Sequence, residues 1–75
     1  MKRMFISDAT SKGLQAFVKY SRPEFSSVCY QVELTKNGLF LANWDGGYFI
    51  GEENTGNSKK SMIDDWDNFI NNLQL

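Results

Sequence analysis

Residues 28 to 50 constrain the fold most, because they predict neighbouring antiparallel strands. Apolar residues occupy every second position from Val28 to Leu34 and alternate with mostly polar ones, a pattern typical of a strand that buries one face. Asn37-Gly38 follows, and this dipeptide favours a two-residue hairpin turn because both central residues of such a turn adopt positive φ. The sequence therefore predicts a β-hairpin with its turn at residues 37 and 38.

The register of this hairpin determines which side chains share a face. A two-residue turn pairs Leu34 with Leu41 and Val32 with Asn43. A second turn is predicted at residues 45 to 47, where the sequence is Asp-Gly-Gly. The first face then gains four residues beyond Val28 to Leu34: Leu39, Leu41, Tyr48 and Ile50. The opposite face carries Phe40, Ala42, Trp44 and Phe49.

Residues 61 to 75 predict an α-helix. Their apolar residues recur at three- and four-residue spacing and line one side: Met62, Ile63, Trp66, Phe69, Ile70 and Leu73. Ser61 with Asp64 resembles a capping box, and Asp64, Asp65 and Asp67 complement the helix dipole. These three aspartates could instead form a metal cluster, but helix capping is the favoured interpretation. We expect the helix to cover the first, more aliphatic face of the sheet.

Residues 14 to 20 allow two interpretations. As a helix that begins near Asp8, they would present apolar side chains on one side and could cover the second face of the sheet. As a strand, they would widen the sheet. Gly13 and the Ser/Thr-rich residues before it weaken the helix, so a strand is favoured, preceded by a strand over residues 4 to 7 and a turn over residues 8 to 13. Pro23 ends either element.

The predicted fold class is α+β, in a single domain that spans residues 1–75. A small antiparallel β-meander of three to five strands packs against a C-terminal α-helix, with an additional N-terminal helix as the alternative. A chain of this length buries only about 60 to 65% of the surface that its unfolded form exposes. Its 15% aromatic content therefore favours a core made of a few large side chains.

The residue types present exclude most catalytic chemistry. The chain has no histidine, which removes the commonest general base and most zinc sites, and we expect no enzymatic activity, cofactor or metal. Cys29 is the only cysteine, so no internal disulfide can form and a reducing, cytoplasmic location is predicted. No apolar run reaches the length of a signal-peptide core or a membrane span, so no membrane association is expected.

The second face of the sheet is the candidate binding surface. It carries Phe40, Trp44 and Phe49, which Phe17 joins if residues 14 to 20 form a strand. Left uncovered, such an aromatic patch would exceed what a monomer normally exposes to water. Its cover could be an N-terminal helix, a second copy in a homodimer, or a partner protein. These four residues are the predicted partner-binding residues.

The sequence therefore predicts a small non-enzymatic protein-binding module that acts as an inhibitor or regulator. In size and in its lack of catalytic groups it resembles a general type, that of immunity proteins, antitoxins and phage-encoded inhibitors. The alternative is a single-stranded nucleic-acid-binding protein that stacks bases on the same aromatic face. The net charge of −1 and the scattered basic residues make nucleic acid the less favoured partner.

Overall fold

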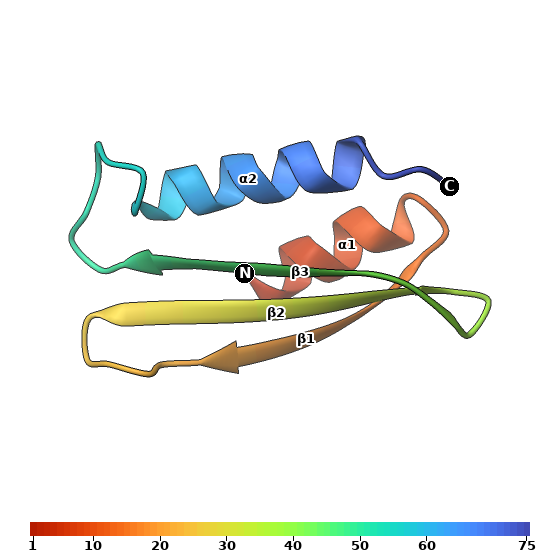
Figure 1. The fold of residues 1–75 in the computed structure, drawn as a ribbon, viewed down its shortest axis with the longest axis horizontal. Helices are drawn as coiled ribbons and strands as arrows, with labels where there is room; N and C mark the ends of the chain where they lie inside the picture. The colour runs from red at the N-terminus through yellow and green to blue at the C-terminus, as the bar shows by residue number, and fades with distance from the viewer.

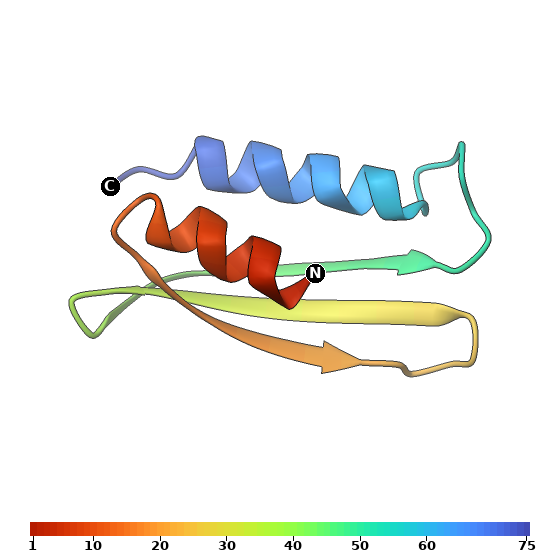
Figure 2. The ribbon, with the colours of Figure 1, turned by 180° about the vertical axis from the view of Figure 1, so that it is seen from behind.

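The computed structural model describes all 75 residues and has five elements of secondary structure. In chain order these are α1 (Lys2–Thr10), β1 (Gln15–Ser21), β2 (Ser27–Lys36), β3 (Leu39–Phe49) and α2 (Lys59–Asn71). The strands form one antiparallel sheet in the order β1-β2-β3, and both helices lie on the same side of it (Figures 1 and 2). This arrangement confirms the predicted α+β class and the meander packed against a C-terminal helix. No helix is long and apolar enough to cross a membrane.

The N-terminal helix exists, but it lies earlier in the chain than the helical alternative placed it. Residues 2–10 form α1, so the predicted strand over residues 4 to 7 is wrong. Phe5 and Ala9 stand one helical turn apart and are both fully buried, which explains why this segment is stable as a helix. Gly13 follows with a φ of 73°, a conformation that suits the end of a helix, and the chain then enters β1. The favoured strand over residues 14 to 20 is thereby confirmed.

The β2–β3 hairpin has the predicted turn and an unpredicted bulge. Asn37 and Gly38 have φ angles of 53° and 81°, as a two-residue turn requires. Between Leu34 and Thr35 the register shifts, because Leu34 pairs with Ala42 whereas Thr35 pairs with Phe40. One residue of β3 is therefore left over, as in a β-bulge, and the residues after it lie on the face opposite to the one that an unbulged ladder would give them.

Trp44 consequently lies on the face opposite to the one predicted. It pairs with Val32 and is only 5% exposed, among the core residues beneath the helices. The prediction that Trp44 shares the second face of the sheet with Phe40 and Phe49 is wrong, because that prediction assumed an unbulged ladder in which Val32 pairs with Asn43. A shift of one residue moves a side chain to the other side of a sheet.

The predicted turn at residues 45 to 47 is also wrong, since β3 continues through them to Phe49. The two glycines serve packing instead. A Cβ atom on Gly46 would lie 2.0 Å from Cη2 of the Trp44 indole, and one on Gly47 would lie 2.7 Å from the carbonyl oxygen of Val28. The Trp44 ring thus covers the strand two residues further along, where a side chain would otherwise stand.

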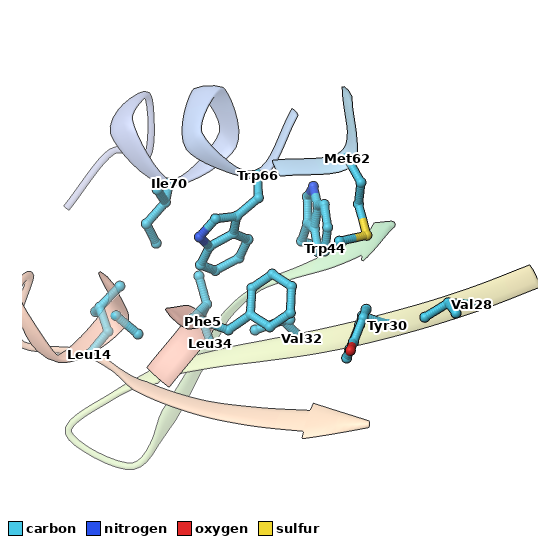
Figure 3. Packing of buried hydrophobic residues seen from close by; sticks show 11 residues of the cluster. Phe5, Leu14, Val28, Tyr30, Val32, Leu34, Trp44, Met62, Trp66 and Ile70 are labelled. Carbon is cyan, nitrogen blue, oxygen red and sulfur yellow. The ribbon is translucent and has the colours of Figure 1, made fainter. Parts of the chain in front are cut away.

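The core between the helices and the sheet is mainly aromatic at its centre (Figure 3). The Phe5 ring of α1 lies 4.9 Å from the ring of Trp66, 5.5 Å from that of Trp44 and 5.2 Å from that of Tyr30, measured between centroids. The two indoles are 5.2 Å apart and nearly perpendicular. Edge-to-face contacts of this kind add stabilisation beyond the burial of area.

Two indole N–H groups tie the layers together through carboxylates. Trp44 Nε1 donates to Asp65 of α2 at 2.9 Å, which links the sheet to this helix. Trp66 Nε1 donates to Asp8 of α1 at 2.8 Å, which links the two helices. Because a buried indole N–H without an acceptor is costly, these bonds fix the orientation of both rings.

The N-cap of α2 lies three residues before the predicted one, Ser61. Ser58 is the N-cap and its hydroxyl oxygen accepts from the backbone N–H of Ser61 at 3.1 Å. The first turn holds no acidic residue, so the predicted capping role of Asp64, Asp65 and Asp67 is wrong. The predicted apolar side is confirmed: Met62, Trp66 and Ile70 are buried in the core.

Candidate interaction surface

The face of the sheet that neither helix covers is the candidate functional surface, and we call it the outer face. The strand pairing places its side chains in rows that cross the sheet. Phe17, Glu33 and Asn43 form one row, and Lys19, Gln31 and Asp45 form the next. Gln15, Thr35 and Phe40 form the row nearest the β2–β3 turn. The outer face is therefore mixed in character and not uniformly aromatic.

Three of the four predicted binding residues lie on the outer face and are exposed. The exposed fractions of Phe17, Phe40 and Phe49 are 58%, 63% and 42%, whereas Trp44 lies in the core. Phe17 and Phe40 occupy adjacent rows on the two edge strands. Phe49 is nine residues beyond Phe40 along β3, a distance of roughly 30 Å at the rise of a β-strand. The structure therefore places Phe17 and Phe40 in adjacent rows at opposite edges of the sheet, with two strand spacings of nearly 5 Å each between their strands, and leaves Phe49 farther away.

A shallow hollow of about 380 Å³ lies between these rows. Its lining comes from all three strands: Phe17, Lys19, Gln31, Glu33, Asn43 and Asp45. The five polar members of this set have exposed side chains, and none of them takes part in a side-chain hydrogen bond within the chain. Their donors and acceptors are free to meet groups on another molecule.

The charges of the hollow are also unpaired. Lys19 and Asp45 share a row but are separated by Gln31, so two strand spacings of nearly 5 Å each keep them about 10 Å apart. Glu33 lies diagonally next to Asp45 across the β2–β3 ladder. The only ion pair in the structure is elsewhere, between Lys60 and Asp64 of α2. The hollow thus presents two carboxylates and one ammonium group to solvent.

Exposed apolar residues near the loop between β1 and β2 were not predicted from the sequence. Phe25, in the loop between β1 and β2, is 94% exposed, and Arg22 Nη2 donates to its carbonyl oxygen. Ile50 lies next to this loop because its backbone N–H donates to the carbonyl oxygen of Ser26 at 2.7 Å. The signal for Phe25 was a lone aromatic residue in a polar stretch just after Pro23. Alternation and helical spacing, which guided the prediction, do not detect a residue in a loop.

Two titratable groups have a raised pKa, Tyr30 in the core and Lys60 on α2. Burial raises the pKa of Tyr30, with smaller contributions from Tyr48 and Tyr20. A hydrogen bond to Asp64 raises the pKa of Lys60. No three His, Cys, Asp or Glu side chains gather in a group that could hold a metal ion. The outer face therefore offers contact surface and charge.

No protein-family model matches this chain, and it has no significant match among curated proteins or solved structures.

Proposed function

We propose that this protein is a non-enzymatic protein-binding module, an inhibitor or regulator of the immunity-protein, antitoxin or phage-inhibitor type, and that the outer face binds its partner. The observation that supports this proposal best is the pair of exposed phenylalanines, Phe17 and Phe40, beside a polar hollow on a face that no helix covers. Large exposed apolar side chains that flank unpaired polar groups are typical of protein interaction sites.

The aromatic residues that stabilise the fold and the exposed Phe17 and Phe40 lie on opposite faces of the sheet, which supports this proposal. The aromatic residues that stabilise the fold lie under the helices, where Phe5, Trp44 and Trp66 contact one another. Phe17 and Phe40 contribute little to that core, because more than half of each side chain is exposed. Aromatic anchors of this kind supply much of the binding energy in protein interfaces.

Charge favours a protein over a nucleic acid as the partner. In the hollow, Glu33 and Asp45 oppose the single cation Lys19. A phosphate backbone would meet net repulsion there, since binding to nucleic acid depends on neutralising phosphates with Lys and Arg. A protein surface with mixed charge has no such cost.

The test compares a Phe17→Ser/Phe40→Ser double variant with the wild type and with Phe25→Ser as a matched control. All three forms are used in affinity capture from nuclease-treated lysate of the native host, after circular dichroism has established that each is folded. We expect the same protein to be captured by the wild type and by Phe25→Ser, but not by the double variant. Equal capture by all three forms would contradict the proposal.

Self-association is measured on the same proteins. Light scattering after size-exclusion chromatography gives the molar mass of the wild type and of the double variant. A wild-type dimer that the Phe17→Ser/Phe40→Ser variant converts to a monomer would show that the outer face binds a second copy. That result would replace the proposed partner with the protein itself.

A further inference from the structure

The free edge of β3 is the feature that extends the proposed function. β3 is an edge strand, because the sheet order is β1-β2-β3. Its last residue shows which way its backbone groups point. The N–H of Phe49 donates away from the sheet to the carbonyl oxygen of Asn57 at 2.9 Å, whereas the N–H of the next residue, Ile50, donates toward the β2 side.

Backbone direction alternates along an antiparallel strand, so every second residue before Phe49 also points its N–H and C=O away from β2. These residues are Gly47, Asp45 and Asn43. No turn, loop or cap bond engages their backbone groups. Three consecutive edge positions of β3 therefore have unpaired donors and acceptors.

Little blocks this edge. Natural edge strands are commonly protected by proline or lysine residues or by a β-bulge. β3 contains no proline or lysine over its 11 residues, and its bulge lies near the β2–β3 turn, before Asn43. Helix α2 packs above β3 on the inner side, where Trp44 bonds to Asp65. The connection to α2 closes only the end of the edge, through Asn57.

We propose that the edge of β3 from Asn43 to Gly47 accepts an extended segment of the partner protein as a fourth strand, with a basic side chain of that segment beside Asp45. This inference rests on the proposed protein-binding function and names the chemistry of the partner. Strand addition of this kind obtains affinity from main-chain hydrogen bonds and specificity from alternate side chains.

Charge complementarity identifies the basic residue. Asp45 is central among the three free positions, and its side chain lies on the outer face. Glu33 is its diagonal neighbour across the ladder, at a distance of roughly 7 Å. An arginine or lysine on the added strand would thus lie beside Asp45, which has no ion-pair partner in the chain, and Glu33 one strand further in adds to the negative charge there.

The same charge disfavours a second copy of this chain at the edge. If two β3 strands paired antiparallel through their free positions, Asn43 would face Gly47 and Asp45 would face Asp45. Paired residues in such a ladder are about 5.5 Å apart, and like charges directly opposite each other destabilise the pairing. The edge is therefore better suited to a basic strand from a different protein.

The probe for this proposal is a labelled peptide, Thr-Val-Thr-Val-Arg-Val-Thr, with a second version that carries Glu in place of Arg. The full-length protein, labelled with nitrogen-15, is titrated with each peptide and its amide signals and exchange rates are followed by NMR. We expect the Arg peptide to bind about tenfold more tightly than the Glu peptide, which corresponds to about 1.4 kcal/mol. We also expect slower amide exchange at Asn43, Asp45 and Gly47.

Two variants separate edge pairing from contact with the face. Asn43→Pro removes an outward-pointing donor, a change that edge strands tolerate, and should weaken binding of the Arg peptide at least tenfold. Asp45→Lys keeps the backbone groups and reverses the charge, so it should prefer the Glu peptide. If Asn43→Pro does not fold, the charge preference of Asp45→Lys still tests whether the peptide binds beside residue 45.

The proposal would be overturned by equal affinity for the two peptides, by no charge reversal in Asp45→Lys, or by no binding at millimolar peptide. Binding that a folded Asn43→Pro variant leaves unchanged would overturn it as well. Failure of this proposal is distinguishable from failure of the proposed function. If Phe17→Ser/Phe40→Ser loses capture of the host protein while Asn43→Pro retains it, the outer face binds the partner and the edge does not.

Discussion

The close approach of Trp44 to Gly46 makes Gly46→Ala a sharp test of the core. The added Cβ would lie 2.0 Å from Cη2 of the indole, so the ring must move. Overpacking of this kind costs about 1 to 3 kcal/mol. A displaced ring also loses its 2.9 Å bond to Asp65, and a hydrogen bond to a charged group contributes about 1.5 to 3 kcal/mol. Replacing a strand glycine by alanine returns about 0.5 to 1 kcal/mol.

We therefore expect Gly46→Ala to lower the free energy of unfolding by about 2 to 4 kcal/mol, a decrease in Tm of roughly 10 to 30 °C for a domain of this size. Urea unfolding followed by tryptophan fluorescence measures this change. Gly56→Ala is the matched control, because a Cβ there meets no atom within 4 Å. It should change the free energy of unfolding by less than about 0.5 kcal/mol.

A double-mutant cycle identifies the ring as the cause. In a Trp44→Leu background the indole is gone, so Gly46→Ala should cost less than about 1 kcal/mol. A cost in that background equal to the cost in the wild type would refute the explanation. Wild-type stability of Gly46→Ala itself would show that the indole does not occupy the position described.

Three further predictions concern the helices and the core. Asp8→Ala leaves the buried N–H of Trp66 without its acceptor and should cost about 1 to 3 kcal/mol in urea unfolding, whereas Asp8→Asn, whose amide oxygen still accepts, should cost less. Ser58→Ala removes the cap of α2 and should cost about 1 kcal/mol by the same measurement, and a Ser58→Asp variant that is equally destabilised would argue against capping. Burial raises the pKa of Tyr30, so the folded protein keeps the phenol proton to higher pH than the unfolded chain does. The stability that this difference provides is present below about pH 10 and is lost as the pH rises further. Thermal unfolding between pH 9 and 11 should therefore show a smaller alkaline loss in Tyr30→Phe than in the wild type.

Local patterns were sufficient to predict several elements of this fold. The Asn37-Gly38 turn follows from the positive φ that its residues must adopt, and α2 follows from apolar spacing that Met62, Trp66 and Ile70 confirm. Such signals depend on residues close in sequence. They are therefore visible before any tertiary contact is known.

The errors arose where tertiary packing decides the backbone. The bulge opposite Leu34 leaves no local sequence signal, yet it moves Trp44 from the outer face into the core. Gly46-Gly47 was predicted to be a turn because glycine pairs usually are, whereas here the residues make room for an indole and a carbonyl group. Alternation predicted that Phe17 and Phe40 share one face of the sheet, whereas Phe49 was placed there through a turn that the structure does not have. Whether that face is exposed depends on where the helices pack, which alternation does not reveal, and the role of these residues in binding stays a prediction.

Because both helices lie on one side of the sheet, the other side can change in sequence while the fold is kept. The core lies on the side of the sheet that the helices cover. Positions on the outer face, such as Gln31, Glu33 and Asn43, can therefore vary at a cost of about 0.5 kcal/mol or less each in the free energy of unfolding. A library randomised at these positions would sample new recognition properties on an unchanged scaffold. A lineage under selection could in the same way exchange one target for another without first acquiring compensatory mutations.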